Sequence, residues 1–223
     1  RRSRTGSMKD SLIVLSGGMD SVTLLHSQRD RIALALTFDY GSNHNAREIA
    51  CARENCLALG IEHIVIGLDL FAQYFKSSLL EGADAIPEGG YDDSNMKSTV
   101  VPFRNGIMLS IACGIAESRG LKQVMLASHS GDHSIYPDCR PGFVEAMDRA
   151  MKEGTYEGIG IFAPFTKLGK ADIARIGAES GVDFSRTYSC YKGGEKHCGK
   201  CGTCRERQEA FKAAGIEDPT LYE

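Results

Sequence analysis

Leu12-Ile13-Val14-Leu15-Ser16-Gly17-Gly18-Met19-Asp20-Ser21 is the stretch of this chain that decides its fold. Its first four residues predict a short buried strand, and the apolar run from Val22 to Leu25 predicts that a helix follows. Two adjacent glycines at the junction remove side chains, so backbone N–H groups can converge on phosphate oxygens. Ser16 and Ser21 add hydroxyl donors, and the helix N-terminus adds a partial positive charge. A tight turn capped by Ser or Asp is the simpler alternative, but this composition favours phosphate binding.

The rest of the chain repeats the alternation of apolar strand and helix. We expect further strands at 32–38, 64–67, 124–127 and 160–163, and further helices at 46–57, 107–116, 141–151 and 170–180. Glycines stand where helices should end, at Gly60, Gly120 and Gly181. The pattern predicts an α/β fold with a doubly wound, mainly parallel sheet covered by helices on both faces. Ligands of such sheets bind at the carboxyl ends of the strands.

Length and composition are those of one globular domain with a small appended lobe. The chain has 223 residues, of which 42% are hydrophobic and 25% charged. The net charge of −3 argues weakly against a general nucleic-acid binder. Residues 1–7 look like an expression remnant before Met8, without the apolar core of a secretory signal. Because no run approaches the ~20 apolar residues of a membrane span, we expect a cytoplasmic protein with reduced thiols.

Four of the eight cysteines are clustered, at Cys190, Cys198, Cys201 and Cys204. Four thiolates suit a tetrahedral, structural Zn²⁺ site, so the spacing predicts one zinc ion per chain. A redox pair does not explain four cysteines, whereas an iron–sulfur cluster remains an alternative. His197 is a candidate substitute ligand, although a solvated loop histidine is the simpler interpretation. Cys51, Cys56 and Cys113 lie in apolar helical patterns and are expected to pack as small hydrophobic side chains.

One segment, 82–98, interrupts the alternation. It is rich in glycine and acidic residues. A loop of this length is either a functional lid or a mobile surface loop.

The string from Ser16 to Ser21 closely resembles the signature of the PP-loop ATP pyrophosphatases. The resemblance implies that ATP is cleaved between its α- and β-phosphates and that the substrate is adenylated. Mg²⁺ is expected beside the phosphates, and Asp20 either helps to hold that ion or orients the loop. Lys170, which begins a helix, is a further phosphate ligand or else a solvated lysine. The expected ATP-binding residues are Leu15, Ser16, Gly17, Gly18, Met19, Asp20, Ser21, Val22, Thr23, Leu24, Leu25 and Lys170.

Five further motifs narrow this class. They are Phe38-Asp39-Tyr40-Gly41, Val101-Pro102-Phe103-Arg104-Asn105, Ser130-Gly131-Asp132-His133, Tyr136-Pro137-Asp138-Cys139-Arg140-Pro141 and Ser189-Cys190-Tyr191-Lys192-Gly193-Gly194-Glu195. Together with the segment from Ser16 to Ser21, which we call the phosphate loop, they resemble the 7-cyano-7-deazaguanine synthase family (preQ0 synthase, QueC) from about Leu12 to Pro219. Phe103 departs from the family pattern, in which small or polar residues also occur, but leaves Arg104 and Asn105 intact.

The resemblance implies that ATP adenylates 7-carboxy-7-deazaguanine and that ammonia displaces AMP to give an amide. A second ATP then activates the amide oxygen, and loss of the second AMP leaves the nitrile. Relatives imply a homodimer. The net charge and the lack of a long apolar run predict no stable binding to nucleic acid and none to a membrane. The expected organisation is a PP-loop ATP-binding domain over 8–186 and a zinc-binding region over 187–223.

Under this resemblance, Arg104, Asn105, Asp132, Asp138 and Arg140 are the candidate substrate ligands. A buried carboxylate accepts hydrogen bonds from a guanine-like edge, and an arginine pairs with the substrate carboxylate. The alternatives are a capping aspartate, at Asp138 for the helix that opens at Pro141, and a surface arginine. The candidate catalytic residues are Ser16, Asp20, Ser21, Arg104 and Asp132, with His44 and His133 as candidate general bases.

Two other functions remain open from the sequence. One is a PP-loop enzyme that modifies tRNA, which should carry a basic surface or an added RNA-binding domain. The other is a zinc-knuckle binding module with an inactive ATP loop, against which the intact Ser16, Asp20 and Ser21 argue.

Overall fold

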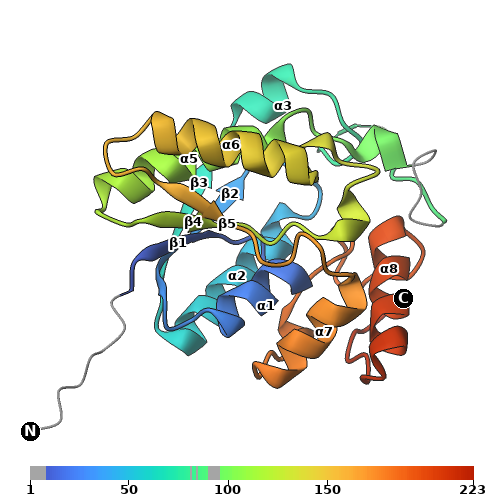
Figure 1. Cartoon of the computed structure of the whole chain (residues 1–223). Coiled ribbons are helices and arrows are strands. Elements are labelled where there is room, and N and C mark those ends of the chain that lie inside the picture. Colours follow the sequence, from blue (N-terminus) through green and yellow to red (C-terminus); the bar gives the residue numbers. More distant parts are fainter. Residues whose placement is uncertain (1–8, 81, 84, 90–95) are drawn as a thin grey trace, which may run out of the picture.

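Five parallel strands form one sheet in the order β3-β2-β1-β4-β5 (Figure 1). The computed structural model describes residues 9–80, 82–83, 85–89 and 96–223. The strands are β1 (Ser11–Val14), β2 (Ile32–Asp39), β3 (Glu62–Gly67), β4 (Gln123–Met125) and β5 (Gly160–Phe162). The chain runs outward from β1 to one edge and then returns to build the other edge from β4, so the carboxyl ends of β1 and β4 form the switch point where ligands of such sheets bind.

Helices cover both faces of the sheet (Figure 1). One face carries α3 (Leu70–Tyr74), α5 (Arg104–Ser118) and α6 (Pro141–Glu153). The other carries α1 (Met19–Ser27), α2 (Asn45–Leu59) and α7 (Lys170–Glu179). The last helix, α8 (Gly202–Ala214), packs against α7. The predicted doubly wound α/β fold is therefore confirmed.

Alternation along the strands separates two hydrophobic cores, because successive side chains point to opposite faces. In β1, Leu12 lies in the core beneath α5 and α6, whereas Ile13 lies in the core with α1, α2 and α7. Both side chains are fully buried. The run of consecutive apolar residues is thus explained by a strand buried on both faces.

Observed boundaries lie within a few residues of those expected from the sequence. Two helices begin earlier than expected: α5 begins at Arg104, and α1 begins at Met19 rather than at Val22. In α1, Gly18 serves as the N-cap and Met19 is already buried in the core. Gly60 ends α2 in the left-handed conformation, as its position predicted. The one-turn helix α3 gave no periodic signal, since Phe71 is its only fully buried side chain.

One helical stretch among the described residues, Lys97–Ser118, is long and apolar enough to cross a membrane by length and composition. It contains α5, whose Leu109 and Ala112 are fully buried against the sheet. The core helix of a globular protein passes the same test, and this stretch is such a helix. Residues 1–7, interpreted above as an expression remnant, lie outside the described residues.

Arg207 ties the C-terminal region to the rest of the fold. Its guanidinium is fully buried and donates to the Phe184 carbonyl at 2.8 Å, to Ser189 Oγ at 2.9 Å and to Thr220 Oγ1 at 2.8 Å. These acceptors precede and follow α8 in the chain. Phe211, also on α8, packs edge-on against Phe184 in the second core. The 187–223 region is therefore packed directly onto the α/β core.

Replacing this anchor should destabilise the whole chain. We predict that Arg207→Ala lowers the free energy of unfolding by about 3 kcal/mol, because three acceptors lose their donor and a cavity forms. Urea titration of the metal-loaded protein measures it. Arg205→Ala, an exposed arginine on the same helix, should stay within about 0.5 kcal/mol of the parent chain. Equal losses for both variants would contradict the role given to Arg207.

Candidate active site and metal centre

The phosphate loop is clamped between two other parts of the chain. Gly17 has φ +99°, and a Cβ built on it would lie 2.0 Å from the Glu48 carbonyl oxygen. On the other side, the Tyr188 N–H donates to the Gly17 carbonyl at 3.0 Å. Only glycine satisfies both the left-handed conformation and the close approach of α2. Gly17 therefore has a packing reason beside the phosphate chemistry inferred from the sequence.

Serine hydroxyls fix the conformation of the phosphate loop at the start of α1 by hydrogen bonds within the loop. Ser21 Oγ accepts from the Ser16 N–H at 3.1 Å and lies 3.0 Å from Ser16 Oγ, which in turn accepts from the Gly18 N–H at 3.1 Å. No side chain caps α1 at Gly18. The first N–H groups of a helix have no partner within it, so this N-terminus is prepared to bind an anion.

A pocket opens beside this loop, at the carboxyl ends of the central strands. Its walls include loop residues Leu15, Ser16, Gly18, Met19, Asp20 and Ser21. Gly17 and Val22 to Leu25 are not among the described residues that line it; their buried positions support the loop from behind. Of the predicted ATP ligands, six loop residues and Lys170 thus border the pocket.

Lys170 is the centre of a buried cluster of charges at one end of the pocket. Its Nζ lies 2.5 Å from Asp20 Oδ2 and 3.3 Å from Glu206 Oε2. Nε2 of the buried His129 lies 3.6 Å from Asp20 Oδ2 and 3.3 Å from Asp132 Oδ2. The interpretation of Lys170 as a solvated lysine is wrong, because its side chain is only 15% exposed.

The charges of this cluster stabilise one another. Burial favours the neutral acid at Asp20, yet Lys170 and His129 outweigh it and lower the pKa of Asp20 below its usual value. Burial opposes the charge of Lys170, but Asp20 and Glu206 raise the pKa of that ammonium. Burial raises the pKa of Glu206. Asp20 Oδ1 is buried without a hydrogen-bond partner among the described residues, so a cation at this oxygen suits the site.

An arginine and three tyrosines form the opposite end of the pocket. Arg104 Nη1 donates to the Tyr40 hydroxyl at 2.9 Å, and the hydroxyls of Tyr136 and Tyr191 lie 2.8 Å apart. Burial disfavours the arginine charge, but the neighbouring tyrosines and Asp138 raise the pKa of Arg104. A permanent cation among aromatic faces suits a planar, anionic ligand.

Two of the predicted substrate ligands do not reach the pocket. Asp138 Oδ2 accepts from the Asn105 N–H at 2.7 Å, so this aspartate caps α5 rather than the helix at Pro141. Arg140 is exposed and donates from Nε to the His133 carbonyl at 2.8 Å. Neither is among the described residues that line the pocket, whereas Arg104, Asn105 and Asp132 are. The sequence could not separate the residues that line the pocket from those that do not, because their positions depend on tertiary packing.

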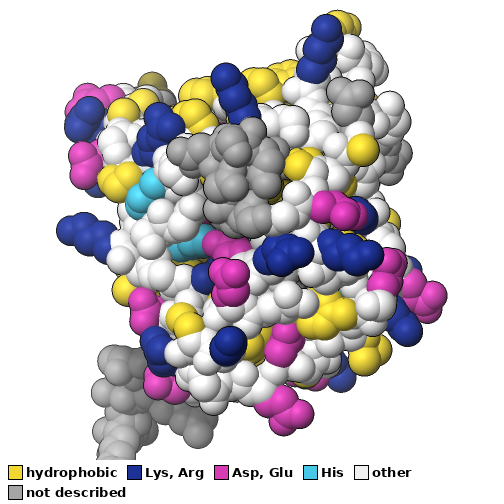
Figure 2. All heavy atoms as spheres, turned by 90° about the vertical axis from the view of Figure 1, so that its right-hand side faces the viewer, with side chains coloured by type: hydrophobic (Ala, Val, Ile, Leu, Met, Phe, Trp, Pro, Cys, Tyr) yellow, Lys and Arg dark blue, Asp and Glu magenta, His cyan; other side chains and the backbone are white. Residues whose placement is uncertain are grey.

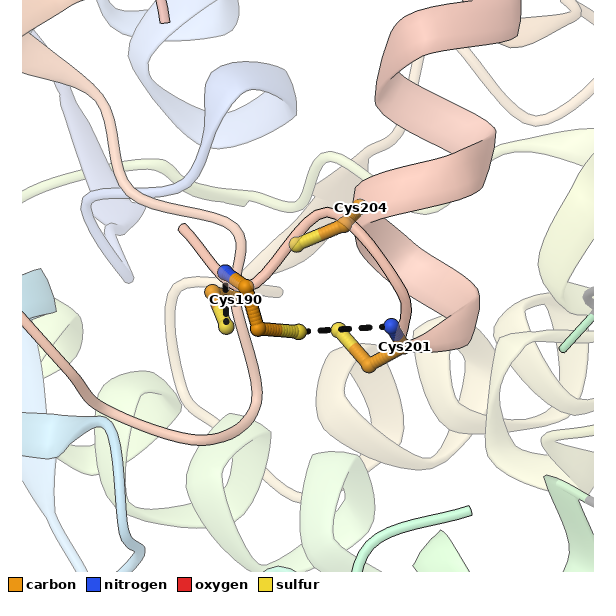
Figure 3. A group of neighbouring side chains, drawn as sticks. Cys190, Cys201 and Cys204 are labelled. Carbon is orange, nitrogen blue, oxygen red and sulfur yellow. Dashed lines mark hydrogen bonds between the residues drawn. The ribbon is translucent and has the colours of Figure 1, made fainter. Parts of the chain in front are cut away.

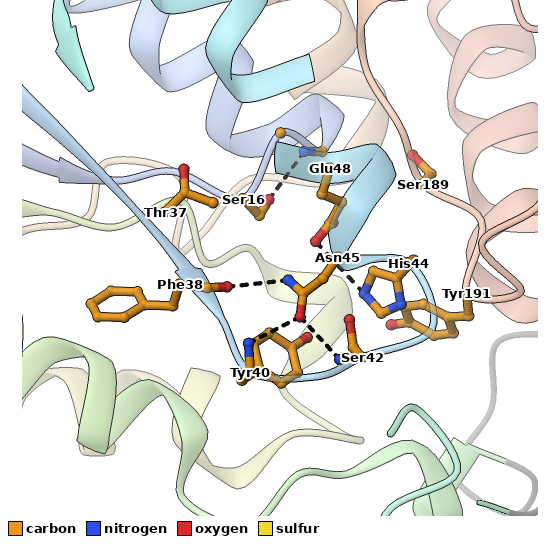
Figure 4. Close-up of polar contacts among 12 residues, drawn as sticks. Ser16, Thr37, Phe38, Tyr40, Ser42, His44, Asn45, Glu48, Ser189 and Tyr191 are labelled. Carbon is orange, nitrogen blue, oxygen red and sulfur yellow. Dashed lines mark hydrogen bonds and ion pairs between the residues drawn. The ribbon is translucent and has the colours of Figure 1, made fainter. Parts of the chain in front are cut away.

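The two candidate general bases differ in position. His44 lines the pocket, but burial and the nearby Arg104 lower its pKa to about 3, so it is a weak base. His133 is half-buried and is not among the described lining residues. Glu48, which the sequence analysis did not single out, lines the same wall as His44 (Figure 4).

The four clustered cysteines meet as the spacing predicted. Their Sγ atoms all lie within 4.8 Å of one another and all four residues are buried. Figure 3 shows Cys190, Cys201 and Cys204 side by side. Sγ of Cys198 accepts from the N–H groups of Lys200 at 3.4 Å and Cys201 at 3.3 Å. Gly199, which follows Cys198, allows this turn with φ +68°. Hydrogen bonds from Cys190 and Cys204 lower the pKa of the Cys201 thiol. Four buried sulfurs of this geometry suit a tetrahedral Zn²⁺.

His197 is not the solvated loop histidine expected from the sequence. It is buried, its Nε2 accepts from the Ser189 N–H at 3.0 Å, and its ring lies 4.6 Å from that of Tyr188. Burial lowers the pKa of His197 to about 4. It therefore supports the segment before Cys190 from outside the sulfur cluster.

Part of the 82–98 segment covers the metal centre. Glu88 bridges to Cys201, the Gly89 N–H donates to the Lys200 carbonyl at 3.1 Å, and Ile86 packs against the cysteine cluster. Asp84 and residues 90–95 lie outside the described residues. These contacts favour neither the lid nor the mobile loop.

Several residues at the pocket gave no signal in the sequence. His129 follows β4, Glu206 lies on α8 and Ser189 precedes the first cysteine of the cluster. Contacts between residues far apart in the sequence bring each of them to the phosphate loop or its pocket. Only the proximity of Ser189 and Tyr191 to Cys190 in a quoted motif hinted at a role.

Known proteins similar to this chain cover nearly all of it. Residues 10–215 match the family described as queuosine biosynthesis protein QueC. A 7-cyano-7-deazaguanine synthase from Porphyromonas gingivalis is 61% identical over 96% of this chain and 98% of its own length. The enzyme of that name from Desulfotalea psychrophila is 51% identical over 96% and 99%. Among solved structures, an NMN synthetase from Francisella tularensis gives a TM-score of 0.50 at 15% identity, covering 94% of this chain and 79% of that one; it supports the fold alone.

The close packing around Gly17 predicts that adding a side chain there lowers activity. Gly17→Ala forces either α2 or the loop to move, and a displacement of about 1 Å at a reacting group costs about 100-fold in rate. We expect at least that loss in nucleotide-dependent activity, with the chain still folded by circular dichroism. Gly114→Ala is the control, since a Cβ there meets nothing within 4 Å. Wild-type activity in Gly17→Ala would refute the clamp.

The cysteine cluster predicts that loss of one cysteine reduces zinc binding. Cys201→Ser should bind much less than one zinc per chain and loosen the C-terminal region, because metal binding and folding are coupled. Elemental analysis and limited proteolysis measure the two effects. Cys113→Ser, a buried cysteine outside the cluster, should keep its zinc. Full metal content in Cys201→Ser would count against the site.

Proposed function

Because this chain belongs to the QueC family, we propose that it converts 7-carboxy-7-deazaguanine and ammonia into 7-cyano-7-deazaguanine at the expense of ATP. The match covers residues 10–215, and the relatives of that name are aligned over nearly their whole length. The product is preQ0, a precursor in queuosine biosynthesis, and the reaction is a ligation that forms C–N bonds.

One observation supports this function beyond similarity. The uncapped N-terminus of α1 and the arginine–tyrosine end built around Arg104 open into the same pocket. A phosphate chain at the loop and a planar acid at Arg104 can therefore meet within one enclosed site. Such a site activates the acid mainly by positioning and by stabilising charge.

The proposed roles follow from these positions. Ser16, Gly18 and Ser21 hold the pyrophosphate portion of ATP, and Lys170 compensates its charge. Asp20 would hold Mg²⁺, which supplies further charge stabilisation on the phosphates. Arg104 pairs with the substrate carboxylate, and Asn105 and Asp132 contact the base. Zn²⁺ on the four cysteines would be structural.

The reaction has two rounds of the same activation. Adenylation turns one carboxylate oxygen into part of a leaving group, and ammonia then displaces AMP to give the amide. A second adenylation activates the remaining oxygen, and elimination of AMP gives the nitrile. We also propose that the chain works as a homodimer in the cytoplasm, where its thiols stay reduced.

A tRNA-modifying function has less support. Figure 2 shows Lys and Arg side chains interspersed with Asp and Glu on the face that it presents, rather than gathered into a basic patch. Nonspecific binding of polynucleotides requires clustered positive charge.

Direct assay of the products tests the proposal. Incubation with 7-carboxy-7-deazaguanine, ammonia, Mg²⁺ and ATP should give the nitrile with two AMP per nitrile, as measured by mass spectrometry and chromatography. An Arg104→Ala chain should lose the acid-dependent part of AMP formation, with the Arg53→Ala variant on the exposed face of α2 as control. Nitrile without AMP, or modification of tRNA in its place, would refute the proposal.

A further inference from the structure

Glu48 places a carboxyl group in the pocket beside the phosphate loop. Its side chain is 14% exposed, and Oε1 lies 3.7 Å from the point that a Cβ on Gly18 would occupy. The Ser16 hydroxyl lies 3.2 Å from that same point. Figure 4 shows the Glu48 carboxyl group pointing toward His44, the N-cap residue of α2. Glu48 therefore approaches the position that the proposed function gives to the phosphates.

Among the described residues, one long ion-pair contact reaches this carboxyl group. No hydrogen bond within the described part of the chain ends on its oxygens, and the nearest ionisable partner is His44 Nε2 at 3.7 Å from Oε2. His44 is neutral, since its pKa lies at about 3. The neighbouring Asn45 side chain is occupied by the N–H groups of Tyr40 and Ser42 and the Phe38 carbonyl. With that one long contact, the Glu48 carboxyl group keeps oxygen lone pairs that can accept a hydrogen bond from a ligand.

Glu48 also differs from its neighbours in the pH at which it ionises. Burial raises the pKa of Glu48 to about 8, although Arg104 on α5 opposes the shift. Apart from His44, the other groups that face Glu48 ionise at higher pH. Burial raises the pKa of Tyr40 above its usual value and raises the pKa of Cys51 to about 11, while Arg104 stays charged. Among these groups, only Glu48 exchanges a proton near pH 8.

We propose that Glu48 is the proton acceptor for the nitrogen atom of the reaction, an inference that rests on the proposed function. In the first half, the ammonia nitrogen bonds to the acyl carbon and the C–O bond to AMP breaks with its electron pair on AMP. Glu48 takes the surplus N–H proton. In the second half, Glu48 takes the last N–H proton of the adenylated amide. The electron pair of that N–H bond becomes the third C–N bond as AMP leaves.

The position of Glu48 favours this role over recognition of the base. The acyl carbon must lie next to the α-phosphate of ATP, which follows directly on the pyrophosphate held by the loop. In the proposed arrangement a group beside Gly18 is therefore near the reacting carbon. The N–H donors of deazaguanine that a carboxylate could bind, N1–H and the 2-amino group, point away from that carbon, and the O6 carbonyl beside it has no proton to donate.

The Glu48→Gln variant distinguishes proton removal from nitrogen, which it should impair, from adenylation, which it should leave intact. Acid-dependent exchange of pyrophosphate into ATP reports adenylation alone and should stay at the parent level, which also shows that the variant is folded. Nitrile formation should fall by about 10²- to 10⁴-fold, the usual contribution of a positioned base. Glu54→Gln, on the exposed face of the same helix, should leave both rates unchanged.

The pH profile at saturating ammonia gives a second readout. The ionised carboxylate is the acceptor, so nitrile formation by the parent chain should rise as pH passes about 8 and then level off. This rise should disappear in Glu48→Gln and persist in Glu48→Asp, which keeps a carboxyl group. If the titration of ammonium caused the rise, all three chains would show it.

Each contrary result has a distinct meaning. A Glu48→Gln chain with the parent rate and pH profile overturns the inference alone. Parallel loss of exchange and nitrile formation also overturns it, because Glu48 would then only position the loop. A parent chain with neither exchange nor nitrile formation overturns the proposed function together with the inference.

Discussion

The approach of the α2 backbone to Gly17 is the constraint on which the site depends. The Glu48 carbonyl occupies the space of a Cβ on Gly17, and the Tyr188 N–H holds the loop from the C-terminal side. The loop is thus fixed between two segments before any ligand binds, so little reorganisation is needed when phosphate arrives. The same approach brings the Glu48 side chain to the edge of the pocket. Loop geometry and the placement of the inferred proton acceptor therefore have one cause.

The metal centre adjoins the pocket. Ser189 and Tyr191 flank Cys190, Thr203 precedes Cys204, and all three border the pocket. Arg207 fixes Ser189 from behind, and Tyr191 meets Tyr136 across the site. Zinc held by the cysteines would fix the course of the backbone through these residues. Loss of the metal should then affect the pocket before it affects the sheet.

The sequence predicted the fold well where the residues that determine an element lie within a few positions of one another. The strand β1, its glycine turn, the C-cap at Gly60 and the cysteine spacing are all of this kind. Long-range contacts explain the failures. Lys170 is paired with Asp20, 150 residues away in sequence, and Asp138 caps α5 from 33 residues away. His129, Glu206 and Glu48 gain their positions only from tertiary packing, so no short window of sequence reveals them.

The central claim is that the loop uses ATP to turn both carboxylate oxygens into leaving groups. Turnover of substrate labelled with ¹⁸O at both carboxyl oxygens tests it most directly. The account predicts unlabelled nitrile and AMP that carries one ¹⁸O per molecule, with no label in pyrophosphate. Label in inorganic phosphate or in water, with unlabelled AMP, would contradict it.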